Sequence, residues 1–193
     1  MGGTGLRSAA PMSTPGSPFG ASPTDRRLYL LRHAKSSWTD ADLPDHDRPL
    51  AGRGRRAADA IADHMRAEAI APELVLCSTA RRARETCERI GPALGAAPVR
   101  YEAGLYGASA MSLLERLRGL PDDVGSVLLI GHNPAIEELA VTLARPSPRR
   151  RDLELKFPTG ALATLTGPLP SWRGLDHDSA ELVAFVRPRD LER

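Results

Sequence analysis

Two histidines and several arginines stand directly after short apolar runs of the sequence. Arg32 and His33 follow the first run, Arg81 and Arg82 lie just beyond a second, and His132 follows a third. Guanidinium groups bind phosphate through charged, paired hydrogen-bond donors, and a neutral imidazole is a competent nucleophile near neutral pH. Residues of these types are typical of a site that binds or transfers a phosphoryl group.

Six short apolar runs alternate with segments of helical periodicity in the chain after residue 25. Such runs are typical of buried strands, and apolar residues spaced three and four apart are typical of helices that pack on a sheet. The predicted strands are 28–31, 74–77, 99–101, 127–130, 161–166 and 182–186, and the predicted helices are 54–69, 80–94, 109–118 and one that begins with a side-chain cap at Asn133 and a proline at Pro134. Segment 167–179 is predicted to be a hairpin-like loop. This alternation predicts an α/β fold, a three-layer α/β/α sandwich with a mostly parallel central sheet.

Three of the predicted strands run into residues that could do chemistry. Ligands of open α/β sheets bind beyond the carboxyl ends of the strands, which is where Arg32, His33 and His132 stand. Helices are predicted to begin at the same edge, and their unpaired N–H groups favour anions. We therefore expect an anion site, above all for phosphate. The spacing does not choose between Arg81 and Arg82, because both fall in the first turn of a helix and outside its apolar stripe.

Length and composition indicate one domain. The chain has 193 residues and a formal net charge of +2, which gives no general attraction to nucleic acids or acidic membranes. No apolar run is long enough to span a membrane, and the N-terminus lacks the apolar core of a signal peptide. Segment 1–25 is rich in Gly, Pro, Ser and Thr and is predicted to be a disordered leader to a domain at 26–193. Cys77 and Cys87 match no zinc or redox motif, so a reducing, cytoplasmic setting is expected.

Four separated motifs carry a resemblance to a known family. They are Arg32-His33-Ala34 with Ser36 and Trp38, Arg48-Pro49-Leu50 with Gly54, the stretch STARRARET at 78–86, and Gly131-His132-Asn133-Pro134. In order and spacing the chain resembles the histidine phosphatase superfamily, whose fold is phosphoglycerate mutase-like. The short chain and the stretches LRHAKSSW and DHDRPLAGRG resemble most the small SixA-type phosphohistidine phosphatases. The usual Arg-His-Gly triplet of the family is Arg-His-Ala here.

The resemblance implies a role for each motif residue. His33 would be the nucleophile and form a covalent phosphohistidine that water then hydrolyses. Arg32 and Arg82 would bind the nonbridging oxygens, and His132 would be a third donor to the phosphoryl group in transfer. Ser36 corresponds to a polar position of the first motif and is a further candidate phosphate contact, with a turn hydroxyl as the alternative. Nearby guanidinium charge should favour the neutral, reactive form of His33.

No metal ion or other cofactor is expected. Arginine side chains already supply the cations that Mg²⁺ would provide, and the sequence has neither a carboxylate cluster nor a phosphate-binding GxxxxGK[ST] loop. Asp45, Asp47 and Arg48 are interpreted as a group of ion pairs that pins a loop. The triplet 149–151, which is all arginine, is interpreted as a solvated turn.

The general acid is the weakest part of the resemblance. Larger relatives carry a carboxylate after the third strand that protonates a departing alkoxide, and Glu102 is the only carboxylate of the stretch YEAGLYGASA. It lies about one residue from the position that the family pattern requires, and a solvated strand end is the competing interpretation. An imidazole that departs from phosphohistidine needs no such acid if its ring is already protonated. The sequence therefore favours phosphohistidine or another labile phosphate over sugar phosphates.

Two other functions stay open. One is a phosphatase of a nucleotide or another small metabolite, with Glu102 as a working acid. The other is a phosphate-binding module without turnover, in which His33 is only a ligand. The expected partner is a phosphorylated protein or a small phosphorylated metabolite, with no nucleic acid and no membrane, and the chain is expected to be a monomer.

Overall fold

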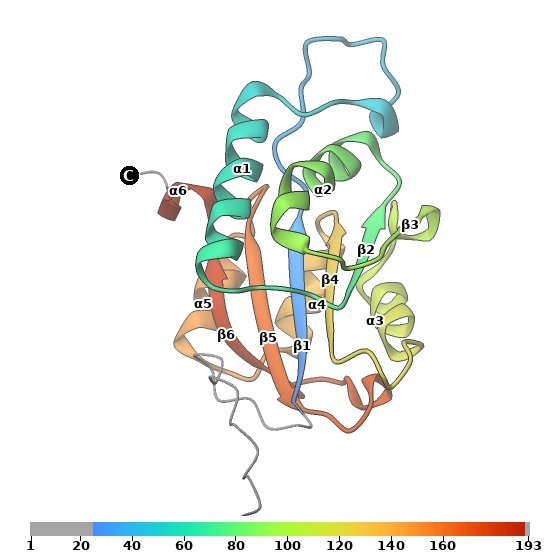
Figure 1. Cartoon of the computed structure of the whole chain (residues 1–193), viewed down its shortest axis with the longest axis vertical. Helices are drawn as coiled ribbons and strands as arrows, with labels where there is room; N and C mark the ends of the chain where they lie inside the picture. Colours follow the sequence, from blue (N-terminus) through green and yellow to red (C-terminus); the bar gives the residue numbers. More distant parts are fainter. Residues whose placement is uncertain (1–24, 192–193) are drawn as a thin grey trace, which may run out of the picture.

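A six-stranded sheet forms the centre of the computed structural model, which describes residues 25–191 (Figure 1). The strands are β1 (Asp25–Arg32), β2 (Leu74–Ser78), β3 (Val99–Glu102), β4 (Ser126–Gly131), β5 (Leu162–Pro168) and β6 (Glu181–Val186), in the spatial order β3-β2-β4-β1-β5-β6. Strands β1 to β4 are parallel, whereas β5 pairs antiparallel with both β1 and β6. The predicted mostly parallel sheet is confirmed, and β5 and β6 form the predicted antiparallel pair.

Helices cover both faces of this sheet. Helices α1 (Gly52–Ala67), α2 (Arg81–Leu94) and α6 (Pro188–Leu191) lie on one face, and α3 (Ala110–Arg118), α4 (Ala135–Leu143) and α5 (Pro148–Leu155) lie on the other (Figure 1). Strand side chains alternate between the two faces. Leu28 and Leu30 therefore join the core under α3 and α4, while Tyr29 and Leu31 join the core under α1 and α2.

The chain after β1 loops over the carboxyl ends of the parallel strands before α1 begins, at the top of Figure 1. Gly54, in the first turn of α1, packs so closely on this loop that a Cβ atom there would lie 2.1 Å from the backbone oxygen of Lys35. Only glycine allows that approach. The loop carries a short 3-10 turn, η1 (Asp45–Asp47), and a second one, η2 (Ala103–Leu105), follows β3. Both turns lie next to the carboxyl ends of strands.

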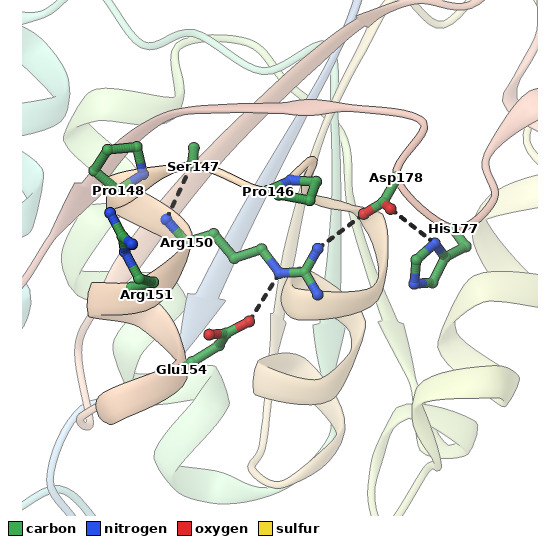
Figure 2. A pocket seen from close by; sticks show the side chains of 8 residues that line it. All are labelled: Pro146, Ser147, Pro148, Arg150, Arg151, Glu154, His177 and Asp178. Carbon is green, nitrogen blue, oxygen red and sulfur yellow. Dashed lines mark hydrogen bonds and ion pairs between the residues drawn. The ribbon is translucent and has the colours of Figure 1, made fainter.

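Two local predictions are wrong. The arginine triplet is not a turn, because it lies in α5, which Ser147 caps by accepting a hydrogen bond from the Arg150 N–H. Arg149 and Arg151 are exposed to solvent, as expected, but Arg150 is partly buried. The Arg150 guanidinium binds the carboxylates of Glu154 and Asp178 (Figure 2). It also donates to the Ala144 carbonyl. A cavity of about 600 Å³ opens beside this side chain, and at its lining Arg150 pairs with Glu154 and Asp178, and Asp178 with His177.

Asn133 does not act as the predicted side-chain cap of α4. Pro134 is the N-cap residue, and the Asn133 amide instead donates to Glu137 and to the Phe157 carbonyl. This bridge ties the segment before α4 to the segment before β5. It fixes the position of the residue that precedes it, His132.

The predicted leader lies outside the described residues except for Asp25, which is the first residue of β1. Within 25–191, no helix is long and apolar enough to cross a membrane. Cys77 and Cys87 are both buried free thiols.

Candidate active site

Neighbouring parallel strands bring the two histidines together. Arg32 is the last residue of β1 and pairs with Gly131, the last residue of β4, so His33 and His132 are the next residues of adjacent strands. Their ring centroids lie 4.9 Å apart. Arg82, in the first turn of α2, donates from Nε to His33 Nε2 at 3.3 Å. These side chains meet at one edge of the sheet, as the ends of the predicted strands indicated.

Hydrogen bonds fix the tautomer of His33. His33 Nδ1 lies 2.8 Å from the Ala34 carbonyl oxygen, which can only accept, so Nδ1 carries the hydrogen. Nε2 is then the basic nitrogen, and it accepts the hydrogen bond from Arg82. The Thr86 hydroxyl accepts from the Ala34 N–H at 3.1 Å and donates to the Arg82 carbonyl, which holds the loop against α2. His33 is thereby presented as a nucleophile through Nε2.

Both histidines are held neutral. Burial lowers the pKa of His33 to about 3, and the charges of His132, Arg82 and Arg32 add to this effect against the opposing hydrogen bond to Ala34. Burial and the charge of Arg82 lower the pKa of His132 to about 4. At neutral pH each ring therefore has a free lone pair on one nitrogen and a hydrogen on the other.

The lowered pKa values predict a loss of stability in acid. Below about pH 6.5 the histidines of the unfolded chain become protonated, whereas the buried rings of the folded chain stay neutral. Unfolding therefore becomes more favourable by roughly 1.4 kcal/mol per pH unit for each ring. Replacing one of these histidines removes its contribution to the loss of stability in acid. Between pH 7.5 and pH 5, we expect His33→Gln to gain about 2 kcal/mol relative to the original chain in urea unfolding. The exposed His177→Gln is the control, and a parallel loss in the original chain and His33→Gln would contradict the lowered pKa.

His132 is oriented by a buried serine. Its Nε2 lies 2.8 Å from the hydroxyl of Ser78, which also accepts a hydrogen bond from the Ala80 N–H. A hydroxyl that already accepts one bond is free to donate its proton to Nε2, which leaves the ring hydrogen on Nδ1. His132 Nδ1 is buried and has no partner within residues 25–191. It is thus placed to donate to a bound ligand.

Arg32 directly precedes His33 in the chain. Its Nη1 donates to the Phe157 carbonyl at 2.6 Å, which anchors the guanidinium, and its buried Nε has no partner in the described chain. A buried donor without a partner is costly unless a ligand satisfies it. This arginine and His132 both keep hydrogen-bonding capacity for a bound anion.

Asp45 is a site residue that the sequence did not identify as one. Its Oδ2 accepts from Arg82 Nη2 at 2.9 Å, and its carbonyl oxygen accepts from Arg82 Nη1 at 2.5 Å. The Tyr106 hydroxyl donates to the same Oδ2 at 2.9 Å, and the Tyr106 ring lies edge-on to His132 with centroids 5.5 Å apart. The Asp45 carboxylate therefore forms an ion pair with the arginine that is predicted to bind phosphate.

The predicted ion pairs in this loop are confirmed in part. Arg48 binds Asp45 Oδ1 and the carbonyl of Ser37, whereas Asp47 contacts His46. The Ser36 hydroxyl accepts from Arg48 Nη2 at 2.9 Å. This contact favours the structural alternative for Ser36, a hydroxyl that pins the loop.

The structure separates the two arginines that helical spacing left equivalent. Arg82 is buried against His33, as the family resemblance implied, while Arg81 faces solvent and pairs with Glu85. Both stand in the first turn of α2, but the side chain of Arg82 points toward the carboxyl end of β1.

Glu102 lies at the end of the edge strand β3, where both oxygens are bound by Arg116 of α3. Arg116 Nε and Nη2 donate to the two oxygens at 2.8 and 2.7 Å. This bidentate pairing occupies both carboxylate oxygens and ties them to α3. This pairing favours a structural role for Glu102 over the role of general acid.

Comparisons with known proteins agree with this geometry. Residues 28–113 match the model of the histidine phosphatase superfamily (branch 1). An uncharacterised protein of Mycobacterium tuberculosis is 39% identical over 163 residues, which cover 82% of this chain and all of the relative. Two solved structures share the fold, each described as a "putative phosphohistidine phosphatase SixA". The one from Nakamurella multipartitia has a TM-score of 0.76 and 33% identity and covers 85% of this chain and 96% of that one. The one from Agrobacterium tumefaciens has a TM-score of 0.72 and 32% identity and covers 87% and 100%.

Proposed function

This chain belongs to the histidine phosphatase superfamily, and we propose that it removes the phosphoryl group from phosphohistidine in proteins without a metal ion. The observation that carries the proposal is the pair formed by Arg82 Nε and the lone pair of His33 Nε2, 3.3 Å apart and next to His132. The proposed nucleophile, a neutral imidazole, already accepts a hydrogen bond from the guanidinium that would bind the phosphate.

In the first step, the His33 Nε2 lone pair attacks phosphorus. The bond from phosphorus to the leaving atom breaks, and its electron pair stays with that atom. Arg32, Arg82 and His132 donate to the three nonbridging oxygens and stabilise their charge during transfer. His33 becomes an Nε2-phosphorylated imidazolium, which keeps its hydrogen on Nδ1 and donates it to the Ala34 carbonyl oxygen.

In the second step, water attacks the phosphorus of phosphorylated His33. The bond between phosphorus and Nε2 breaks, and its electron pair returns to His33 as a neutral ring. Both protons of the water leave with the product, which departs as dihydrogen phosphate. His33 is then ready for another cycle, and dividing one displacement into two is the advantage of the covalent route.

The leaving group decides the substrate class. An alkoxide must be protonated as it leaves, and both oxygens of the candidate acid Glu102 are occupied by Arg116. A phosphohistidine whose ring carries a proton on its distal nitrogen leaves as a neutral imidazole. The residues of this site therefore suit phosphohistidine better than alkyl phosphates. The buried free thiols Cys77 and Cys87 agree with work in the reducing cytoplasm, which we propose as its location.

The test is a substrate panel in the presence of EDTA. We expect fast loss of phosphate from a phosphohistidine-containing protein, measurable hydrolysis of para-nitrophenyl phosphate, and slow hydrolysis of a simple alkyl phosphate. Glu102→Gln should leave the first rate unchanged, because the carboxylate only pairs with Arg116.

Fast hydrolysis of the alkyl phosphate that Glu102→Gln abolishes would contradict the proposal. It would favour a phosphatase of nucleotides or other metabolites, with Glu102 as the acid. Tight phosphate binding without hydrolysis of any substrate would favour a binding module. Activity that EDTA removes would contradict the metal-free mechanism.

A further inference from the structure

We propose that Asp45 and Tyr106 form a subsite for a flat, cationic leaving group, and that Asp45 determines specificity for phosphohistidine over phosphate esters. The inference rests on the proposed function and names the residues that select its substrate. The carboxylate and the phenol come from two different loops, which follow β1 and β3 respectively.

One guanidinium joins this pair to the nucleophile. Arg82 donates from Nε to His33 Nε2 and from Nη2 to Asp45 Oδ2, at 3.3 and 2.9 Å. The atom that receives the phosphoryl group and the carboxylate are therefore separated by little more than the width of a guanidinium. A phosphoryl group bound to Arg82, together with the group that it leaves, must lie next to Asp45.

Asp45 is fixed as an anion in this place. Its Oδ1 accepts from Arg48 Nη1 at 2.9 Å, and its Oδ2 accepts from Tyr106. Partial burial would raise the pKa of Asp45, but the hydrogen bonds from Tyr106 and Arg82 and the charge of Arg82 outweigh it, and the pKa is lowered. An ionised carboxylate cannot protonate an alkoxide. Asp45 shares its charge with Arg48 and Arg82, so relative to a neutral side chain at this place it disfavours a dianionic ester and favours a cation.

The aromatic ring of Tyr106 completes the subsite. It lies edge-on to His132 and to His46, with centroids 5.5 and 4.9 Å away, and its side chain is partly exposed at the mouth of the site. An aromatic ring beside a carboxylate is a suitable environment for a planar cation. The imidazolium ring of protonated phosphohistidine is such a group, whereas the alcohol portion of a phosphate ester is not.

The subsite acts in the first step of the reaction. Asp45 favours the substrate whose distal ring nitrogen is protonated, by attraction to its positive charge. When His33 Nε2 attacks, the bond from phosphorus to the substrate nitrogen breaks and the electron pair stays on that nitrogen. The ring keeps its distal proton and leaves as neutral imidazole, so no acid has to supply a proton.

The experiment compares two substrates in Asp45→Asn. Asparagine keeps the size of the side chain and an oxygen acceptor for Arg82 and Tyr106 but removes the charge. The measured quantity is the ratio of kcat/KM for a phosphohistidine-containing protein to kcat/KM for para-nitrophenyl phosphate. We expect this ratio to fall at least tenfold. Inorganic phosphate should also inhibit Asp45→Asn more strongly than the original chain, because no charge competes for Arg82.

Asp47→Asn is the matched control. It removes the same charge from the same 3-10 turn, but Asp47 contacts His46 and not Arg82, so its ratio should equal that of the original chain. An unchanged ratio in Asp45→Asn, with both constants lowered together, would assign Asp45 the role of holding Arg82 and overturn the inference. That result leaves the proposed function intact. An original chain that hydrolyses para-nitrophenyl phosphate but not phosphohistidine would overturn both.

Discussion

The variant His33→Ala should fold, and its kcat should be lower by a factor on the order of 10⁴ to 10⁶. This is the scale of loss on removal of a catalytic nucleophile. The side chain supplies the lone pair that Arg82 Nε contacts, and the proposed covalent intermediate cannot form without it. The fold should persist, since the Ala34 N–H still binds Thr86. Initial rates with para-nitrophenyl phosphate measure the loss.

A trapping experiment identifies the nucleophile directly. When the enzyme is quenched during turnover of a radioactive substrate, the label should be acid-labile and alkali-stable and should lie on the peptide that contains His33. His132→Ala is the matched comparison, because the proposed mechanism makes His132 a donor and not the nucleophile. It should lower kcat by about 10²- to 10³-fold and still allow labelling. Label on His132, or full activity in His33→Ala, would contradict the mechanism.

The positions of the two histidines were predictable because they depend on strand ends. Apolar runs end directly before Arg32 and before His132, and parallel neighbours align their carboxyl ends. That logic needs no side-chain detail. The identity of the arginine did need it, since Arg81 and Arg82 occupy the same turn of α2 and differ only in which one points toward β1.

Asp45 could not be predicted from periodicity. Its contact with Arg82 joins residues 37 positions apart, and the loop that carries it has no repeating pattern. The signal available in the sequence was the density of charge in DHDRPL, which was interpreted as ion pairing within the loop. Arg48 does pair with Asp45, as that interpretation required. The second oxygen of the carboxylate, however, faces Arg82 and Tyr106.

Glu102 and α5 also depend on contacts between segments that the sequence pattern did not reveal. The strand end at Glu102 was recognisable, but its partner Arg116 lies on the next helix, and only the packing of α3 beside β3 brings the two together. Helix α5 did carry a local signal, a serine cap followed by proline. Its arginines masked that signal because a run of charge is usually solvated. Arg150 binds three groups contributed by α5 and by two other segments.

Arg82→Ala should lower kcat/KM by at least about 10²- to 10³-fold, through a lower kcat and a higher KM. The guanidinium contacts the nucleophile and would bind a phosphoryl oxygen in the ground state as well as in the transition state, so affinity and rate depend on the same group. Steady-state kinetics together with competitive inhibition by inorganic phosphate separate the two effects. Arg82→Lys keeps the charge but cannot donate from two parallel N–H groups, so it should recover only part of the affinity.

Arg81→Ala is the control for this prediction. Arg81 has the same chemistry in the same turn, but it faces solvent and pairs with Glu85, so its removal should leave both constants unchanged. Because burial is the largest cause of the low pKa of His33, Arg82→Ala should also leave His33 neutral at neutral pH. Its defect should therefore be the same at pH 6 and at pH 8. A defect that appears only at low pH would mean that Arg82 acts by keeping His33 unprotonated, and a larger defect in Arg81→Ala would mean that α2 presents the other arginine to the substrate.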